Sequence, residues 1–156
     1  MIINVSKLVS EKALDYEFRL YQDDLSGFVD EYSGVIDENG LLVKGSIQKC
    51  SAGEFHLKFM VEGSIVYLCA RCLEPTPLES VYEYEDTIEL EAGTESIDLR
   101  SYVYECLFIN EPFKVLCDEA CKGLCPSCGA NLNHGNCSCG EVLDIDPRME
   151  ALKKLL

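Results

Sequence analysis

Eight of the ten cysteines in this 156-residue chain form four closely spaced pairs, an arrangement that suits metal binding. A structural zinc ion takes four nitrogen or sulfur ligands in a tetrahedral arrangement, and proteins commonly supply them as close pairs. Four thiolates leave no coordination position for a catalytic water. The spacing therefore predicts one or two structural Zn²⁺ ions, bound by Cys69, Cys72, Cys117, Cys121, Cys125, Cys128, Cys137 and Cys139.

The preferred grouping puts the last two pairs on one ion and the first two pairs on the other. The last two pairs lie within residues 125–139, and glycines beside them ease the tight turns of a local loop. The first two pairs would tie the end of a strand to the approach of the C-terminal segment, and so constrain a large loop of unfolded chain. An interleaved pairing stays open, and His134 is an alternative ligand.

Three other thiol chemistries compete with zinc. Disulfides persist in oxidising compartments, but residues 1–12 lack the basic and apolar regions of a secretory leader. No stretch is apolar over the roughly 18 residues of a membrane span, so a cytoplasmic protein without membrane contact is expected. A thioredoxin-like pair at Cys69 and Cys72 should open a helix, yet Pro75 and Pro77 follow it. Iron–sulfur ligation uses the same residue types and is the less favoured alternative.

The segments that must position these pairs are mostly predicted strands. Residues 14–20 alternate apolar and charged side chains, which is typical of a half-buried strand. Residues 35–36 and 41–49 flank an Asn39-Gly40 turn signal and predict a hairpin. Residues 55–68 predict a long strand with a bulge or bend at Gly63, and residues 78–91 predict a further strand.

Helices are predicted late in the chain. Asp98 is the expected N-cap of a helix that ends near Asn110, before Pro112. Asp146-Pro147 predicts the start of a second helix that runs to the C-terminus. The two cysteines outside the pairs, Cys50 and Cys106, are expected to be small buried hydrophobes.

The fold class expected from this order is α+β. It consists of a mostly antiparallel β-sheet or partly open barrel, followed by helices and a Cys-rich zinc-ribbon-like segment. Residues 1–112 are expected to form the β-rich domain with its following helix. Residues 113–156 are expected to form the zinc-binding segment with the C-terminal helix, packed against the first domain partly through Cys69 and Cys72.

The chain is strongly acidic, with 13 Lys and Arg against 28 Asp and Glu and a formal net charge of −15. Alternate positions of the predicted strand 78–91 carry a row of carboxylates, which would repel one another without a counter-charge. The row is either a solvated face that keeps the sheet edge soluble or a docking surface for a basic partner. Its members are Glu79, Glu83, Glu85, Glu89 and Glu91.

Residues suited to catalysis are scarce. The chain offers two imidazoles, His56 and His134, and no nucleophile elbow or phosphate-cradling loop. The sequence therefore predicts a protein that is not an enzyme and has no small-molecule substrate.

Several motifs, taken in order, carry a resemblance to a known family. They are Cys69-Ala-Arg-Cys72-Leu-Glu-Pro75, then Asp98-Leu99 with Glu105 and Pro112, then the run from Cys117 to Cys139 with Asn131-Leu132-Asn133, then Asp146-Pro147-Arg148 with Leu152. This order resembles the YceD family, whose name refers to accumulation of large-subunit ribosomal RNA. The resemblance implies a small cytoplasmic bacterial protein of large-subunit ribosome biogenesis. Some members lack the distal four cysteines, which implies that the two quartets are separable.

Two functions suit such a protein. One is an acidic binding protein that holds a basic ribosomal protein, or contacts a pre-ribosomal particle, until delivery. The other is a direct RNA-binding assembly factor that uses the zinc module and the basic residues of the C-terminal third, namely Lys114, Lys122, Arg148, Lys153 and Lys154. The charge favours the first, because neutralising phosphates requires a cluster of Lys and Arg that an acidic chain lacks.

Overall fold

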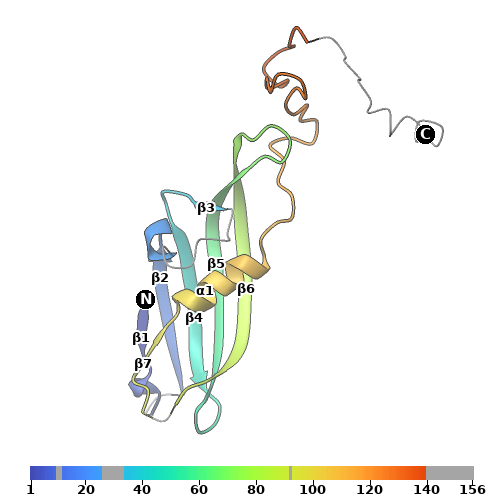
Figure 1. The fold of residues 1–156 in the computed structure, drawn as a ribbon. Helices are drawn as coiled ribbons and strands as arrows, with labels where there is room; N and C mark the ends of the chain where they lie inside the picture. Colours follow the sequence, from blue (N-terminus) through green and yellow to red (C-terminus); the bar gives the residue numbers. More distant parts are fainter. Residues whose placement is uncertain (10–11, 26–33, 92, 140–156) are drawn as a thin grey trace, which may run out of the picture.

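The computed structural model describes residues 1–9, 12–25, 34–91 and 93–139. In this part of the chain, strands precede a single α-helix, and the Cys-rich segment comes last (Figure 1). The expected order of sheet, then helix, is therefore confirmed. The second helix, expected from Asp146 onward, lies outside the described residues. Within the described ranges no helix combines the length and the apolar character of a membrane span.

The main sheet is antiparallel and open. β2 (Ala13–Leu20) pairs with β4 (Leu41–Lys49), β4 pairs with β5 (Glu54–Leu68), and β5 pairs with β6 (Pro75–Glu89). Among the described strands, β2 and β6 each pair on one side alone, so the sheet is open at both edges, as the expected antiparallel sheet allows. Two prolines at the start of β6 fit an edge strand, because proline cannot donate a ladder hydrogen bond.

The hairpin expected around Asn39-Gly40 is wrong. β3 (Val35–Ile36) pairs with residues 65–66 of β5, whereas β4 pairs with residues 55–62 of the same strand. β5 is long enough to pair with β3 and β4 one after the other. The turn at Asn39-Gly40 therefore connects two strands that lie along the same edge of β5 and do not pair with each other. Gly63 lies where β5 changes partner, and its φ of 154° favours glycine. The pairing of β5 with β6 runs through Gly63 without a bulge.

A small second sheet fixes the N-terminus beside the helix. β1 (Ile2–Asn4) pairs antiparallel with β7 (Ser96–Asp98), and the two short 3₁₀ helices η1 (Ser6–Val9) and η2 (Gln22–Leu25) flank β2. α1 (Arg100–Ile109) follows β7 directly. The helix starts one residue later than expected: Leu99 occupies the N-cap position, and Asp98 Oδ1 accepts the backbone N–H of Arg100 at 3.1 Å.

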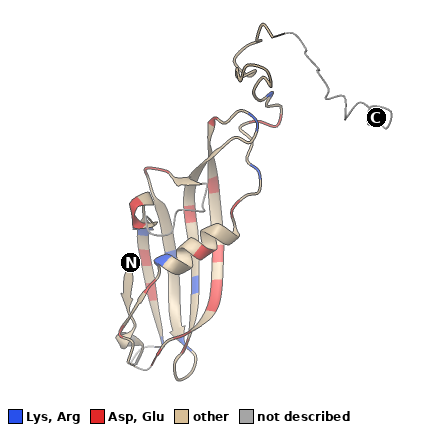
Figure 2. Cartoon of the chain, viewed as in Figure 1, with Lys and Arg blue, Asp and Glu red and all other residues tan. Residues whose placement is uncertain are grey.

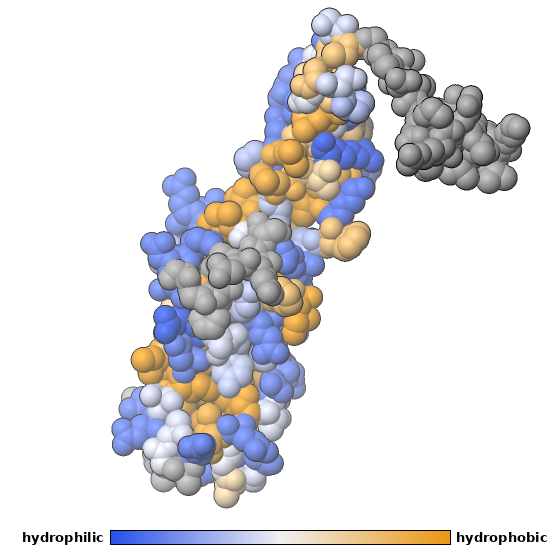
Figure 3. All heavy atoms as spheres, viewed as in Figure 1, coloured by the Kyte–Doolittle hydropathy of each residue, from blue (hydrophilic) through white to orange (hydrophobic). Residues whose placement is uncertain are grey.

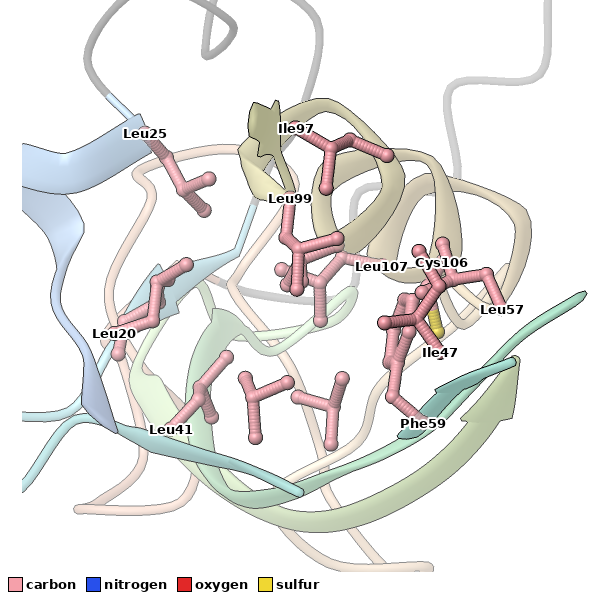
Figure 4. Close-up of a cluster of buried hydrophobic side chains, with 14 of the residues drawn as sticks. Leu20, Leu25, Leu41, Ile47, Leu57, Phe59, Ile97, Leu99, Cys106 and Leu107 are labelled. Carbon is pink, nitrogen blue, oxygen red and sulfur yellow. The ribbon is translucent and has the colours of Figure 1, made fainter. Parts of the chain in front are cut away.

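The hydrophobic core lies between α1 and one face of the curved sheet (Figure 4). Leu99, Val103, Cys106 and Leu107 are buried on the helix side, as the helical periodicity predicts. Opposite them lie buried residues of the two central strands β4 and β5, among them Leu41, Ile47, Leu57 and Phe59. Burial of Cys106 is confirmed, but Cys50 is exposed, because it lies in the loop between β4 and β5 instead of in a strand.

Candidate functional site

Eight cysteine sulfur atoms gather in two groups of four. Most of these cysteines belong to the segment that follows α1 and extends past the sheet (Figure 1). Within each group, all four Sγ atoms lie within 4.8 Å of one another. The grouping matches the preferred one rather than the interleaved pairing. We name the groups the proximal quartet (Cys69, Cys72, Cys117, Cys121) and the distal quartet (Cys125, Cys128, Cys137, Cys139).

The proximal quartet joins two distant parts of the chain. Cys69 and Cys72 lie in the turn between β5 and β6, and this turn is closed by a hydrogen bond from Cys69 N–H to Glu74 O at 2.9 Å. Ala70 N–H donates to Val115 O at 2.9 Å, which aligns the turn with the segment after α1. The Arg71 guanidinium donates to Cys121 O at 2.8 Å. These bonds place Cys121, 52 residues away in sequence, beside Cys69.

The distal quartet is built locally. Gly129 N–H donates to Cys125 O at 2.8 Å, and Cys125 N–H donates to Ala130 O at 2.8 Å. Gly129 has a φ of 74°, a conformation that glycine adopts without strain. Cys125 is buried, Cys128 is exposed, and the remaining two thiols are half-buried. This quartet is therefore more open to solvent than the proximal one, in which three of the four cysteines are buried.

The sulfur separations fit a tetrahedral ion. A zinc–sulfur bond of about 2.3 Å places neighbouring ligand atoms about 3.8 Å apart in a tetrahedron. The Sγ–Sγ distances are 3.9 Å between Cys69 and Cys121 and 3.4 Å between Cys125 and Cys137. Disulfide sulfurs would lie about 2.05 Å apart. The donor set therefore fits one thiophilic cation in each quartet.

Protonation of the thiols follows from their hydrogen bonds. Hydrogen bonds from backbone N–H groups, chiefly that of Cys117, lower the pKa of Cys69 to about 6. Backbone N–H groups of Cys128 and Ser127 likewise lower the pKa of Cys125 to about 6. The neighbouring sulfurs of Cys72 and Cys121 raise the pKa of Cys117 to about 12. Each quartet thus holds one thiol that ionises readily beside others that resist ionisation without a cation.

The surroundings of Cys69 and Cys72 differ from those of a thioredoxin-like redox pair. Their turn connects two antiparallel strands, whereas the redox motif opens a helix after a parallel strand. His134 belongs to neither quartet. Its Nε2 lies 2.5 Å from Glu74 Oε1, and this contact holds the pKa of Glu74 below its usual range.

Spacing alone missed the residues that surround the sulfurs. Arg71, Glu74 and Asn133 all contact the proximal quartet or its backbone. Arg71 and Glu74 flank Cys72, and Asn133 belongs to the Asn-Leu-Asn run of the distal loop. Their closeness to the cysteines in sequence could have marked them as candidates for contact with the sulfurs. Their roles depend on contacts between segments far apart in sequence.

The acidic row consists of four glutamates of β6 and Glu91, two residues past the end of that strand, and all five are exposed. The four on β6 alternate with Tyr82, Tyr84 and Ile88, which pack on the core, so they lie on the face of the sheet away from α1. Figure 2 shows the acidic positions along β6. Glu85 does have a counter-charge, Lys58, which corrects the expectation of an unbalanced row. Lys58 Nζ lies 3.4 Å from Glu85 Oε2, and His56 Nε2 lies 3.3 Å from Glu85 Oε1. In the described part of the chain, the other four glutamates form no ion pair, and Glu89 stands opposite Glu54 in the β5–β6 register.

Comparison with known proteins gives a consistent assignment. A family model described as "Large ribosomal RNA subunit accumulation protein YceD" matches residues 77–156. The chain is similar to a protein of Arabidopsis thaliana named "Large ribosomal RNA subunit accumulation protein YCED homolog 1, chloroplastic", with 34% identity over 62 residues. That alignment covers 40% of this chain and 19% of the plant protein. No solved structure matches the chain significantly.

A second similarity extends over more of the chain. An uncharacterized protein of Mycobacterium tuberculosis is 31% identical over 132 residues, which are 75% of this chain and 56% of the relative. The chain thus spans about a fifth of the plant relative and just over half of the mycobacterial one. The matched family region contains α1 and six of the eight paired cysteines, and it makes up about half of the chain. The chain belongs to the YceD family.

Proposed function

We propose that this chain is a non-enzymatic, zinc-stabilised factor in large ribosomal subunit biogenesis that binds a basic ribosomal protein. The family description, accumulation of large-subunit ribosomal RNA, supports the process. The exposed glutamates of the acidic row, four on β6 and Glu91 just past its end, support the partner and are the observation on which the proposal chiefly rests. Four of these five carboxylates lack a salt bridge within the described residues, so a cationic surface would gain favourable contacts with them.

The proposed zinc ions have a structural role. They would be held by the two quartets, in a zinc-ribbon-like arrangement around the bridge between Leu124 and Asn131, with iron the less favoured ion. When bound, each ion cross-links four thiolates and adds no open site for a substrate. Each four-thiolate zinc site also carries a formal charge of −2, which makes the molecule more acidic still.

The position of the row suits a protein partner. Its glutamates follow an edge strand, so a ligand can reach them without moving another described strand. Binding through exposed charges is screened by salt, because the Debye length is about 10 Å at 0.1 M ionic strength. Partner binding should therefore weaken as salt is raised, whereas the folded sheet should not change.

One observation favours direct RNA contact as a second candidate function. Phe113 is fully exposed beside Lys114, at the junction between α1 and the Cys-rich segment, where Figure 3 shows apolar residues at the surface. An exposed aromatic ring next to a cation can stack on an unpaired base. The acidic character of the whole molecule opposes this contact, so we rank it second.

Affinity capture from a bacterial lysate, with and without ribonuclease, distinguishes the two functions. We expect a basic ribosomal protein to be retained after RNA is removed, and to be lost when Glu79, Glu83 and Glu89 are all changed to Lys. These three positions are exposed and unpaired in the described structure, so the fold should tolerate the change.

A matched control reverses three exposed acids away from β6, namely Asp15, Glu38 and Glu95. It changes the net charge by the same amount and should retain the partner. Equal loss in both variants would show a nonspecific charge effect and would refute the row as the site. Loss of all bound protein after ribonuclease treatment would favour the RNA function, which Phe113→Ala should then weaken.

A further inference from the structure

The two quartets share a very short connection. Residues 122–124 alone separate Cys121 of the proximal quartet from Cys125 of the distal quartet. Hydrogen bonds fix this connection to both quartets. Leu124 N–H donates at 3.1 Å to the carbonyl oxygen of Arg71, which lies between Cys69 and Cys72. Leu132 N–H, from the distal loop, donates to Gly123 O at 2.9 Å. Gly123 has a φ of 76°, and a Cβ at this position would lie 3.0 Å from Arg71 O. The geometry of one quartet therefore constrains that of the other.

Asn133 adds a direct link between them. It lies in the distal loop between Cys128 and Cys137, yet its side chain reaches the proximal quartet. Its Nδ2 donates to Cys121 Sγ at 3.3 Å, and its Oδ1 accepts the Lys122 N–H at 2.8 Å. Its own N–H donates to Asn131 Oδ1 at 2.9 Å, which orients the loop.

An N–H donor to a metal-bound thiolate stabilises the charge on the sulfur and orients the ligand. Partners of this kind change metal affinity by about 10–100-fold. An ion in the distal quartet would order the loop that carries Asn133, and so would supply this donor to Cys121 at lower entropic cost. By linkage, an ion in the proximal quartet would favour the distal one by the same factor.

We propose that Asn133 couples the two quartets, so that their metal ions load cooperatively. This inference rests on the proposed function, because it requires that both quartets bind zinc. Charge repulsion acts in the opposite direction: two neighbouring centres of formal charge −2 disfavour the second ion. The sign of the coupling therefore shows which effect is larger.

Native mass spectrometry of the chain, titrated with Zn²⁺ against a competing chelator under reducing conditions, measures the coupling. In the unmodified protein we expect the one-ion form to be scarce relative to the zero-ion and two-ion forms. Asn133→Asp keeps an oxygen acceptor for Lys122 but removes the N–H donor to Cys121. In this variant the one-ion form should accumulate, and proximal affinity should fall about tenfold.

Asn136→Asp is the matched control, because it places the same charge in the same loop at an exposed position. It should load like the unmodified protein. Removing the distal site with Cys137→Ser and Cys139→Ser should lower the zinc affinity of the proximal quartet by a similar factor. Adding Asn133→Asp to this variant should then lower that affinity no further.

The outcomes separate the two proposals. Independent loading of two ions, or equal behaviour of Asn133→Asp and Asn136→Asp, would overturn the coupling and leave the zinc sites intact. Absence of any bound metal would overturn the zinc-stabilised function itself, and the coupling with it.

Discussion

Asp98 connects the N-terminus of the chain to the start of α1. Its Oδ1 lies 3.1 Å from the Met1 ammonium, and its Oδ2 accepts a hydrogen bond from Arg100 Nη2 at 2.6 Å. The Arg100 guanidinium first, and the Met1 ammonium after it, hold the pKa of this carboxyl well below its usual range. The charged form of Asp98 therefore stabilises the small β1–β7 sheet and the first turn of the helix.

We expect Asp98→Asn to lower the free energy of unfolding by about 1 kcal/mol at neutral pH, the upper range for partly exposed ion pairs. Because the folded pKa is depressed, this contribution is complete above the unfolded value of about 4 and is lost as the pH falls toward the folded pKa. The difference in free energy of unfolding between the variant and the unmodified protein should thus be smaller at about pH 3 than at neutral pH. Urea unfolding at both pH values measures it. Asp15→Asn, an exposed acid of β2, is the control and should show no such difference.

Other single residues show how far type and spacing can lead. The pairs of cysteines were recognisable because zinc ligands recur at short, characteristic spacings. Cys50 was predicted to be buried, but a thiol in the turn between two strands is solvated however apolar its side chain. Glu85 was grouped with its neighbours because the alternation of β6 is local, whereas its partners Lys58 and His56 lie on β5.

At the scale of elements, Gly45 of β4 allows the neighbouring strands β2 and β5 to pack their aromatic residues. It stands between Tyr16 of β2 and Phe59 of β5 in the register. The Phe59 ring stacks on Tyr84 of β6, with centroids 4.8 Å apart. A Cβ on Gly45 would come within 2.5 Å of Phe59 Cβ and closer still to the Lys58 carbonyl oxygen. The sheet therefore has no room for a side chain here.

Gly45→Ala should destabilise the protein by about 1–3 kcal/mol, the usual cost of overpacking a core, because backbone atoms of β5 would have to move. Ser46→Ala, one residue further along β4 and facing away from the core, is the matched control and should change stability by less than about 0.5 kcal/mol. Chemical denaturation of both variants compares them. Equal stability of the two variants would contradict the close packing of β4 on β5.

The β3–β4 connection shows the limit of local signals within the sheet. An Asn-Gly pair between two short apolar segments is a strong hairpin indication, and the turn itself does form, with Gly40 N–H donating to Asp37 O at 2.8 Å. Which strand each segment pairs with depends, however, on all the strands available in the fold. β5 offers 15 residues, and it pairs with both segments.

At the scale of the whole molecule, two separate buried clusters divide the described chain. The larger lies between the sheet and α1, and the smaller consists of Cys69, Cys72 and Cys121 with Leu116 and Leu124 packed against it. So small an apolar cluster contributes little burial energy. Metal binding is therefore expected to supply most of the stability of the Cys-rich segment.

Removing metal with a chelator should accordingly loosen residues 113–139 and leave the main sheet folded. Hydrogen exchange is the measurement: we expect lost protection at the Cys125 and Gly129 amides, whose hydrogen bonds close the distal loop. The β4–β5 amides are the internal control and should keep their protection. Loss of protection throughout β4 and β5 would contradict this division and would show that the two clusters unfold together.

The sequence by itself determined the features that depend on neighbouring residues. These are the alternation of the strands, the helix at residues 100–109, the paired thiols and the acidic row, all of which follow from spacings of a few residues. Tertiary structure alone decided which partners meet across long stretches of chain. It brought Cys72 next to Cys117, 45 residues away, paired β3 with β5, and set Lys58 against Glu85. Such contacts depend on the packing of the whole chain, because no local spacing encodes the distance between remote segments.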